Sequence, residues 1–487
     1  MPQDLPGFYY DPDKNRYFPI KGPIPGSSRK PKSVPPDQSP VSLPTQVPSK
    51  LKKDIKISKL LQCRELYGST VDLSDRKGSF QEECKKKLVS KPKVWKYQDV
   101  EKDADCSLAL THIAVETPEG QCAADALITG GMNGSLSLFD VGDVGQHGHK
   151  TAAEFVWPEQ DDSGSNQTLK DIWKFNGSTL IMPSSISSIS LSRKEYDAAD
   201  NNSSARQHAL ITTLGSELSG GALYILNLAD PVDLISNFAV VGRLRRHVAL
   251  NCTIWGAETS HTGHKAVVGT SLGATLVDLE SGVSSTLCRS KSDVLSVKFI
   301  QSGNVALCGL RKGAIITVDI RQQQRHLARH SLFHPSDDSN RPGQKRTKPF
   351  VLKGNIQPSS TVYMPSSICC LESLQMYDQY FLASSMDGSI YLYDHRLTKR
   401  GPVQSYEGHV NSHSHIKLAT DASERYLMSG GEDCKVRIWN IRSGEMLFKE
   451  KLSSCVPMAA CWQGCAGINT DAWLGSAEGL LRMQFCL

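Results

Sequence analysis

A strand–turn–strand unit recurs seven times along this 487-residue chain, and the repetition limits the possible folds more than any other feature. Most copies have a strand of small apolar residues, a tight polar turn, and an alternating strand closed by an acid or an amide. The seven copies span Ala126–Asp140, Ala209–Asn227, Ala266–Asp278, Ala306–Asp319, Phe381–Asp394, Tyr426–Asn440 and Ala472–Phe485.

The spacing of the copies predicts the architecture. Successive copies begin about 40 to 85 residues apart, and the shortest spacings fit the four-stranded blade of a β-propeller. One blade leaves an apolar face uncovered, so blades stack around a channel until the ring closes. The sequence therefore predicts an all-β fold, a seven-bladed β-propeller over residues 94–487.

Ring closure needs a strand from outside the last copy. That copy has room for only three strands, near Ala459–Trp462, Ala472–Ser476 and Leu480–Phe485. The segment Val94–Tyr97 precedes the first copy and alternates as a strand should. We expect it to complete the seventh blade.

The N-terminal region differs in composition from the propeller. Half of the 24 prolines lie in the first 50 residues, and residues 21–54 are too poor in apolar groups to offset the entropy of ordering. We expect this Pro-, Ser- and Lys-rich tail to be disordered. Residues 1–20 instead form an aromatic motif, which we expect to be a short strand–turn–strand that docks on the chain's own domain or on an external partner. Its aromatic residues are Phe8, Tyr9, Tyr10, Tyr17 and Phe18.

Two more segments interrupt the repeat pattern. Ile57, Leu60, Leu61 and Leu66 have helical spacing, so residues 55–93 are predicted to be a short helix and a linker. The insertion 322–353, between the fourth and fifth copies, is rich in Arg, Lys, Pro and Ser. We expect it to be a disordered surface loop.

The sequence gives no indication of an enzyme. It has no Gly-Lys dipeptide and hence no Walker A loop, and no H-E-x-x-H or C-x-x-C motif. We therefore expect no catalytic residues, no cofactor and no metal. The first residues lack the apolar core of a secretory signal, no apolar run is long enough for a membrane span, and 14 Cys suggest reduced thiols in the nucleus or cytoplasm. The net charge of +5 does not require nucleic acid, which we consider an improbable direct ligand.

Three successive copies end in related boxes, Asp319-Ile-Arg321, Asp394-His-Arg396 and Asn440-Ile-Arg442. Residues i and i+2 of a strand point to the same side, so each acid or amide can hold its Arg by hydrogen bonds. Three neighbouring blades would then present three guanidinium groups along one rim. The alternative is that Asp-x-Arg only terminates a strand.

The sixth copy resembles a WD40 repeat, because Gly408-His409 opens it and Trp439-Asn440 stands where Trp-Asp is usual. In that family a buried His, Ser or Thr, Asp and Trp form a hydrogen-bonded tetrad. The resemblance implies a tetrad of His409, Ser429, Asp433 and Trp439.

The boxes are also similar to those of WD40 substrate receptors of cullin-4 ubiquitin ligases. The resemblance implies a non-enzymatic receptor that docks on the adaptor, damage-specific DNA-binding protein 1, and through it on cullin-4, while it presents an unidentified client protein. A WD40 scaffold for RNA processing or chromatin is the alternative. Since Leu382–Arg396 matches the box best, we expect Arg396 to matter most, then Arg442, then Arg321. The implied adaptor-binding residues are Asp319, Arg321, Tyr393, Asp394, Arg396, Trp439, Asn440 and Arg442.

Overall fold

The chain forms two compact units, Met1–Ile55 and Lys56–Leu487. The computed structural model describes residues 8–11, 16–19, 70–73, 76–97, 100, 103–117, 120–142, 149–158, 172–192, 207–216, 219–233, 240, 242–300, 303–321, 329–332, 350–354, 356–462 and 470–485. The tail 21–54 and the helix expected near residues 57–66 lie outside these ranges, so both remain predictions.

The first unit contains a β-hairpin. Strands β1 (Phe8–Asp11) and β2 (Arg16–Pro19) are antiparallel, with Tyr9 opposite Phe18 and Tyr10 opposite Tyr17. The predicted strand–turn–strand is therefore confirmed, and its docking partner remains a prediction.

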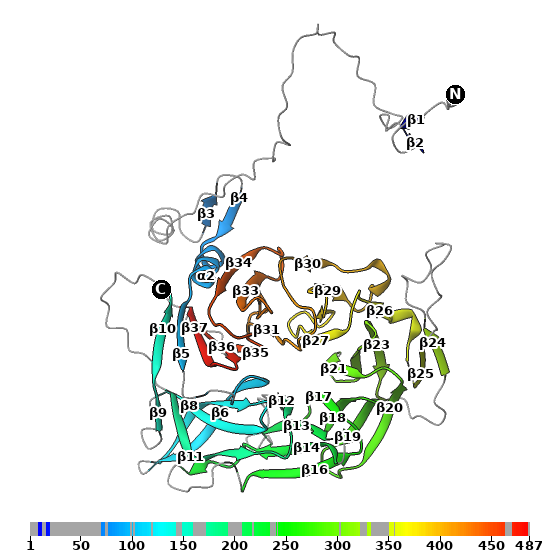
Figure 1. The fold of residues 1–487 in the computed structure, drawn as a ribbon. Helices are drawn as coiled ribbons and strands as arrows, with labels where there is room; N and C mark the ends of the chain where they lie inside the picture. Colours follow the sequence, from blue (N-terminus) through cyan, green and yellow to red (C-terminus); the bar gives the residue numbers. More distant parts are fainter. Residues whose placement is uncertain are drawn as a thin grey trace. The chain divides into compact units, whose positions relative to one another are not determined.

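The second unit contains the predicted seven-bladed β-propeller, shown in Figure 1 with the first strands of the blades around the centre. In blades one to six the four main strands are antiparallel and run outward in chain order. Blade one contains β6 (Ser107–Thr117), β7 (Gly120–Gly130), β8 (Ser135–Val141) and β11 (Ile172–Ile181). Blade two contains β12 (Ile186–Leu191), β13 (His208–Ser216), β14 (Gly220–Asn227) and β16 (Leu244–Leu250). Blade three contains β17 (Ile254–Thr259), β18 (Lys265–Thr270), β19 (Gly273–Asp278) and β20 (Ser284–Ser290).

Blades four to six carry the three boxes at the ends of their third strands. Blade four contains β21 (Val294–Ile300), β22 (Val305–Leu310), β23 (Ala314–Asp319) and β26 (Val362–Tyr363). Blade five contains β27 (Ile368–Ser373), β28 (Tyr380–Ser385), β29 (Ile390–Asp394) and β30 (Gln404–Tyr406). Blade six contains β31 (Leu418–Thr420), β32 (Tyr426–Ser429), β33 (Lys435–Asn440) and β34 (Met446–Lys451). Short elements flank the blades: β9 (His149–Thr151), β15 (Val232–Asp233), η3 (Pro358–Ser360) and η4 (Thr398–Arg400).

Blade seven is closed by the segment that the sequence suggested. Strands β35 (Ala459–Trp462), β36 (Thr470–Ser476) and β37 (Gly479–Phe485) supply three strands, and β5 (Lys93–Tyr97) pairs with β37 as the fourth. Strand β10 (Ala153–Trp157) adds a fifth on the outside. Residues from the start and the end of the propeller therefore share one sheet.

Glycines near the ends of second strands let neighbouring blades approach. A Cβ atom on Gly309 of β22 would lie 2.5 Å from Cγ2 of Ile368 in the next blade. A Cβ atom on Gly475 of β36 would lie 1.7 Å from the carbonyl oxygen of Ala104, which precedes blade one. The glycine in these copies is therefore required by packing between blades.

The apolar core lies mainly between blades. One cluster joins Leu307 and Ile315 of blade four to Ile368 and Phe381 of blade five, all buried. Another joins Trp473 of blade seven to blade one. Each blade thus covers the apolar face of its neighbour, as the repeat pattern predicts.

The ends of the insertion form strands, which corrects the expectation of a disordered loop throughout 322–353. Strand β24 (Arg329–Leu332) pairs with β25 (Phe350–Gly354), and β25 pairs with β20, so both extend the sheet of blade three. The insertion also leaves from between the third and fourth strands of blade four, not from between blades four and five.

One helix precedes the propeller in the described part of the chain. Helix α2 (Phe80–Ser90) follows the hairpin of β3 (Thr70–Leu73) and β4 (Arg76–Ser79). Phe80, Cys84 and Leu88 recur at one helical face and are buried. No helix among the described residues is both long and apolar enough to span a membrane.

Candidate functional site

Two of the three boxes form the same bidentate ion pair on neighbouring blades. The Nε and Nη2 atoms of Arg321 donate to the Asp319 carboxylate at 3.1 and 2.9 Å. The same atoms of Arg396 donate to Asp394 at 3.1 and 3.0 Å. In both boxes the backbone N–H of the Arg also donates to the carboxylate at 2.9 Å. Hydrogen bonds from the Arg side chains hold the pKa of both Asp residues below the ordinary value, so both remain ionised.

The burial of each pair is strongly one-sided. The carboxylates of Asp319 and Asp394 are 10% and 6% exposed, whereas the side chains of Arg321 and Arg396 are 64% and 59% exposed. Each Asp lies opposite the first residue of the preceding strand, Val305 or Tyr380, so the two boxes occupy the same place in their blades. The blades therefore present two fixed guanidinium groups on the same face.

The third box differs. Asn440 occupies the equivalent position opposite Tyr426, but its Oδ1 accepts from the backbone N–H of Ser443 at 3.0 Å. Arg442 is exposed and makes no hydrogen bond or ion pair with any described residue. The expectation that all three boxes hold their Arg is wrong for this one, because an amide placed here caps the following turn.

The aromatic residues of the boxes are in the core. Tyr393 is 2% exposed and stacks on Phe381 with ring centroids 5.5 Å apart. Trp439 is fully buried, and its Nε1 donates to the carbonyl oxygen of Glu407 at 3.0 Å. Both rings are thus covered by this chain's own residues, and their inclusion among the adaptor-binding residues stays a prediction. They position the strand that carries the box.

We call the side of the propeller with the Asp–Arg pairs the box face; on blade five it comprises the loops 374–379 and 395–403. These loops are tied together, since the N–H of His395 donates to the carbonyl oxygen of Gln379 at 3.0 Å. They expose an apolar set around Arg396, namely Met376, Tyr377, Leu397 and Val403. The carboxylate of Glu424 on blade six accepts from the N–H of Met376 at 3.0 Å, so the face continues to the next blade.

Helix α2 lies on the box face of blade six. Lys86 Nζ is 2.6 Å from Glu445, which follows Arg442 in the β33–β34 turn. On the same blade, Arg425 is 3.6 Å from Glu82. Sequence patterns missed this helix because its apolar residues are few; its ion pairs to a distant blade are visible only in three dimensions.

The tetrad implied by the WD40 resemblance is incomplete. Ser429 Oγ lies 3.4 Å from Nε2 of His409, whose stronger contact is the Gly430 carbonyl oxygen at 2.9 Å. Asp433 is bound by the buried Arg437, with Nη1 2.8 Å from Oδ1 and Nη2 2.5 Å from Oδ2. The predicted link between His409 and Asp433 is therefore corrected: an arginine four residues beyond the Asp takes its carboxylate.

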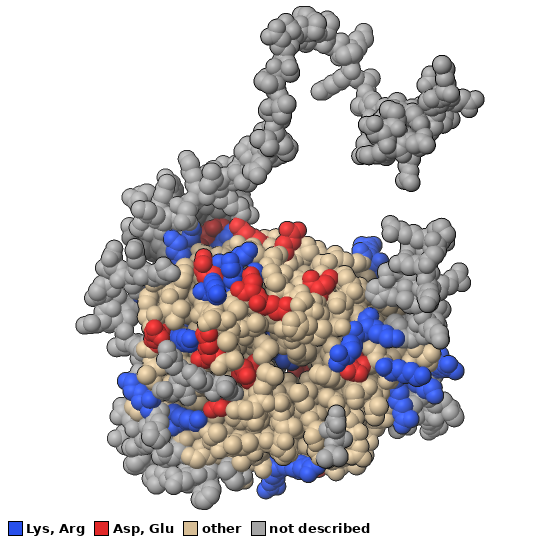
Figure 2. All heavy atoms as spheres, in the orientation of Figure 1, with Lys and Arg blue, Asp and Glu red and all other residues tan. Residues whose placement is uncertain are grey.

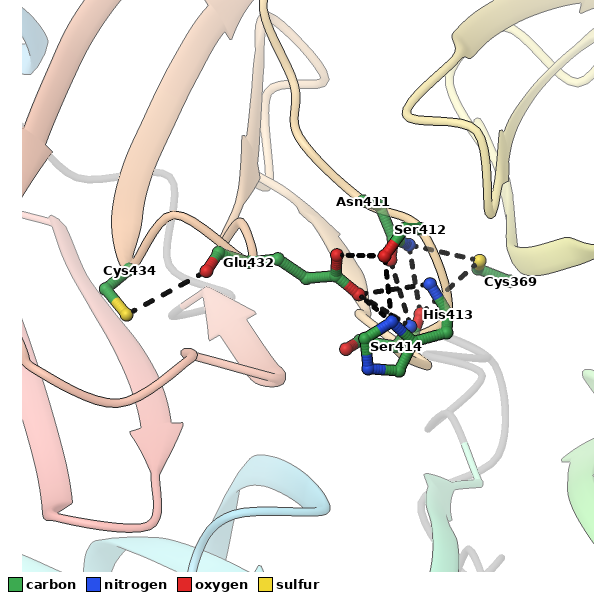
Figure 3. Close-up of polar contacts among 7 residues, drawn as sticks. All are labelled: Cys369, Asn411, Ser412, His413, Ser414, Glu432 and Cys434. Carbon is green, nitrogen blue, oxygen red and sulfur yellow. Dashed lines mark hydrogen bonds and ion pairs between the residues drawn. The ribbon is translucent and has the colours of Figure 1, made fainter.

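The turn between β32 and β33 of blade six also holds the loop 412–414, which lies on the side of the propeller opposite the box face (Figure 3). The Glu432 carboxylate accepts from Ser412 Oγ at 2.6 Å and from the N–H groups of His413 and Ser414 at 3.1 and 2.9 Å. Partial burial alone would raise the pKa of Glu432, but these hydrogen bonds outweigh it and lower the pKa to about 2. His415, the residue after Ser414, donates from Nε2 to the carbonyl oxygen of Leu295, 3.3 Å away, and Leu295 lines the central channel.

The central channel holds paired charges. A cavity of about 170 Å³ is lined by the first strands of the blades. Within it Lys298 Nζ lies 3.0 Å from Glu258 and 3.1 Å from Glu372. In the described part of the chain, no three His, Cys, Asp or Glu residues gather as a metal site would require.

Comparison with known proteins agrees with the sequence resemblance. The family model "WD domain, G-beta repeat" matches residues 400–440, from the outer part of blade five through the third strand of blade six. DDB1- and CUL4-associated factor 4 of Bos taurus is 28% identical over 156 residues, and that of Homo sapiens is 30% identical over 158 residues; each match covers 32% of this chain and 25% of the relative. The human DDB1- and CUL4-associated factor 4-like protein 2 is 38% identical over 82 residues, 17% of this chain and 20% of the relative. The matches thus span about a quarter of these relatives or less, and the chain is similar to WD40 factors associated with DDB1 and CUL4.

Proposed function

We propose that this propeller is the substrate-recognition subunit of a cullin-4 ubiquitin ligase, and that its box face binds the adaptor DDB1, the damage-specific DNA-binding protein 1. The observation that carries the proposal is the repeated Asp–Arg pair on two neighbouring blades. The similarity to DDB1- and CUL4-associated factors supports it. The propeller would contribute proximity, because holding a client beside the ligase raises the effective concentration of its lysines.

The geometry of the pairs suits protein recognition. The carboxylate occupies Nε and Nη2 of each Arg, which leaves the Nη1 donors of Arg321 and Arg396 for a partner. The Asp fixes the guanidinium before binding, so less side-chain entropy is lost on association. Arginine in such a position is a frequent interface anchor.

The apolar residues around Arg396 add to the argument. Met376 and Tyr377 are 68% and 52% exposed, an unusual exposure for such large side chains. A central Arg surrounded by apolar and aromatic groups is the composition typical of an interface core. We therefore place the centre of the adaptor contact on blade five.

Alanine substitution of the three arginines tests the proposal by co-precipitation of DDB1 and CUL4. Arg396→Ala is expected to weaken recovery most, since truncating one partner of a buried charged contact costs about 2–5 kcal/mol, a loss of about 30-fold or more. Arg321→Ala should come next and Arg442→Ala last, because Arg442 lacks the carboxylate that would fix it. This reverses the order of Arg321 and Arg442 that the sequence match suggests.

The control is Arg246→Ala, an exposed arginine on β16 of blade two, which should leave recovery unchanged. Thermal midpoints must show that every variant is folded, because an Arg that only terminates a strand would lower stability instead. Equal recovery by parent and folded triple variant, or no recovery by the parent, would leave the alternative of a WD40 scaffold unrelated to ubiquitin.

A further inference from the structure

Three cations stand directly side by side on the outer strands of the blade-three sheet. Arg289 of β20 is the register partner of Lys353 of β25, and Lys353 is the partner of Arg329 of β24. All three are exposed. Directly opposed residues of antiparallel strands point to one face with Cβ atoms about 5 Å apart, so the three side chains form a row. We call Arg289, Lys353 and Arg329 the cationic row.

Without a bound anion, the cationic row lowers the stability of the fold. Like charges directly opposite one another destabilise a sheet. Among the described residues no carboxylate forms an ion pair with any of the three. The other side of the same strands packs normally, since Leu352 is fully buried. The row is therefore not a by-product of a strand that packs poorly, and an anion bound along it would remove the repulsion.

The surroundings are basic as well. Lys and Arg side chains gather on the side of the propeller where β20, β24 and β25 lie (Figure 2). Residues 322–353 contain seven Lys and Arg and two Asp, a net charge of +5, which equals the net charge of the whole chain. The described Lys and Arg side chains at this edge therefore attract anions over a distance of about 10 Å at moderate ionic strength.

The sheet edge identifies the kind of anion. Strand β24 is the outermost strand in the order β17-β18-β19-β20-β25-β24. One row of its backbone N–H and C=O groups has no strand partner in the described part of the chain, and such an edge is a template for another extended chain. A peptide can satisfy these groups and supply carboxylates, whereas a nucleic acid supplies phosphates without matching backbone hydrogen bonds.

We propose that the β20–β25–β24 edge binds an acidic, extended peptide segment of a partner protein. The segment adds to the sheet along β24, and its carboxylates lie against the cationic row. This surface lies on blade three and does not involve the boxes of blades four to six, so the inference does not rest on adaptor binding.

The test uses the full chain alone and a fluorescent peptide of about six residues, an ordinary strand length, that alternates Glu and Val. The parent protein should bind it, and affinity should fall steeply between about 0.05 and about 0.5 M NaCl. Lys353→Glu should weaken binding about tenfold, since it removes one attraction and adds a repulsion. The same variant should be at least as stable as the parent, because it turns the row into alternating charges.

The matched control is Arg246→Glu, an exposed arginine on β16 opposite Tyr224, which should change the affinity less than about twofold. A peptide N-methylated at alternate residues keeps its charge and loses backbone donors, so it should bind about tenfold more weakly. Equal binding of the methylated peptide would overturn strand addition. Equal binding by Lys353→Glu, no binding by the parent, or tighter binding of a single-stranded RNA of equal charge would overturn the proposal as a whole.

Discussion

The buried arginine of blade six, Arg437, depends on a single carboxylate. The Arg437 side chain is 1% exposed and is held by the carboxylate of Asp433, which is 29% exposed. Gly431 makes room for the pair, because a Cβ atom there would lie 2.6 Å from Arg437 Nη1. The sequence suggested a His409–Asp433 link because the WD40 pattern names those positions. It could not show that Arg437 competes for the same carboxylate.

Removing Asp433 should therefore destabilise the fold strongly. Asp433→Ala leaves the Arg437 guanidinium buried without its counter-ion, which costs about 3–5 kcal/mol. Asp293→Ala is the control, because it breaks an Arg311 pair whose guanidinium is 49% exposed, worth less than about 1 kcal/mol. Urea unfolding of both variants measures the difference. Equal midpoints for the two variants would contradict the role given to Arg437.

At the scale of elements, the sequence predicted the pairs of strands that are neighbours in the chain. The seven strand pairs follow from alternation and turn residues, and all are present. Strand β25 was missed because it pairs with β20, which lies outside the insertion, and β24 was missed with it because β24 pairs with β25. Helix α2 was missed for a similar reason: its ion pairs reach Glu445 and Arg425, more than 300 residues away. Such elements depend on contacts that no local window contains.

The contact between blades at Gly309 should be intolerant of a single methyl group. Gly309→Ala places a Cβ atom 2.5 Å from Cγ2 and 2.9 Å from Cβ of Ile368, near the rigid base of that side chain. Overpacking of this kind costs about 1–3 kcal/mol. Gly142→Ala is the control, since nothing lies within 4 Å of its added Cβ atom. A thermal midpoint that falls for Gly142→Ala and not for Gly309→Ala would refute the packing argument.

The hydrogen bonds of Glu432 to its loop should make the free energy of unfolding depend on pH in the acid range. The folded pKa of Glu432 is about 2, below its ordinary value of 4.5, so the hydrogen bonds to Ser412, His413 and Ser414 stabilise the fold above pH 4.5. That contribution is lost as pH falls from 4.5 toward 2. Glu432→Gln should cost about 1–2 kcal/mol at neutral pH, since solvent screens part of the interaction. Parent and variant should converge near pH 2, and a constant difference from pH 7 to pH 2 would contradict the assignment.

At the largest scale, the propeller is held as a ring by β5. The sequence indicated that the last copy lacked a strand and pointed to Val94–Tyr97, and the structure pairs this segment with β37. Ring closure was predictable because the count of strands per blade is a global constraint. Which residues of the boxes are exposed could not be predicted. Tyr393 and Arg396 belong to the same motif, yet Tyr393 lies in the core and Arg396 lies at the surface.

Tyr97→Ala tests the contribution of the closing strand. Tyr97 is fully buried between blades seven and one, so its truncation should cost about 3–5 kcal/mol. Phe155→Ala on β10, the outermost strand of the same sheet, is the control, and as a partly exposed ring it should cost less than about 1 kcal/mol. Urea midpoints compare the two variants. Similar losses for both would mean that closure contributes little.

The pairing of β5 with β37 also sets the order of events during synthesis. Strand β5 leaves the ribosome before any blade, and its partner is the last strand of the ring to be translated. Six blades can stack on the growing chain, but the seventh stays open until translation has passed β37. Until then the nascent chain carries unpaired strand edges at both ends, where it can pair with other chains. Completion of this ring therefore waits until β37 has been translated, and β5 needs chaperone protection for the whole of that interval.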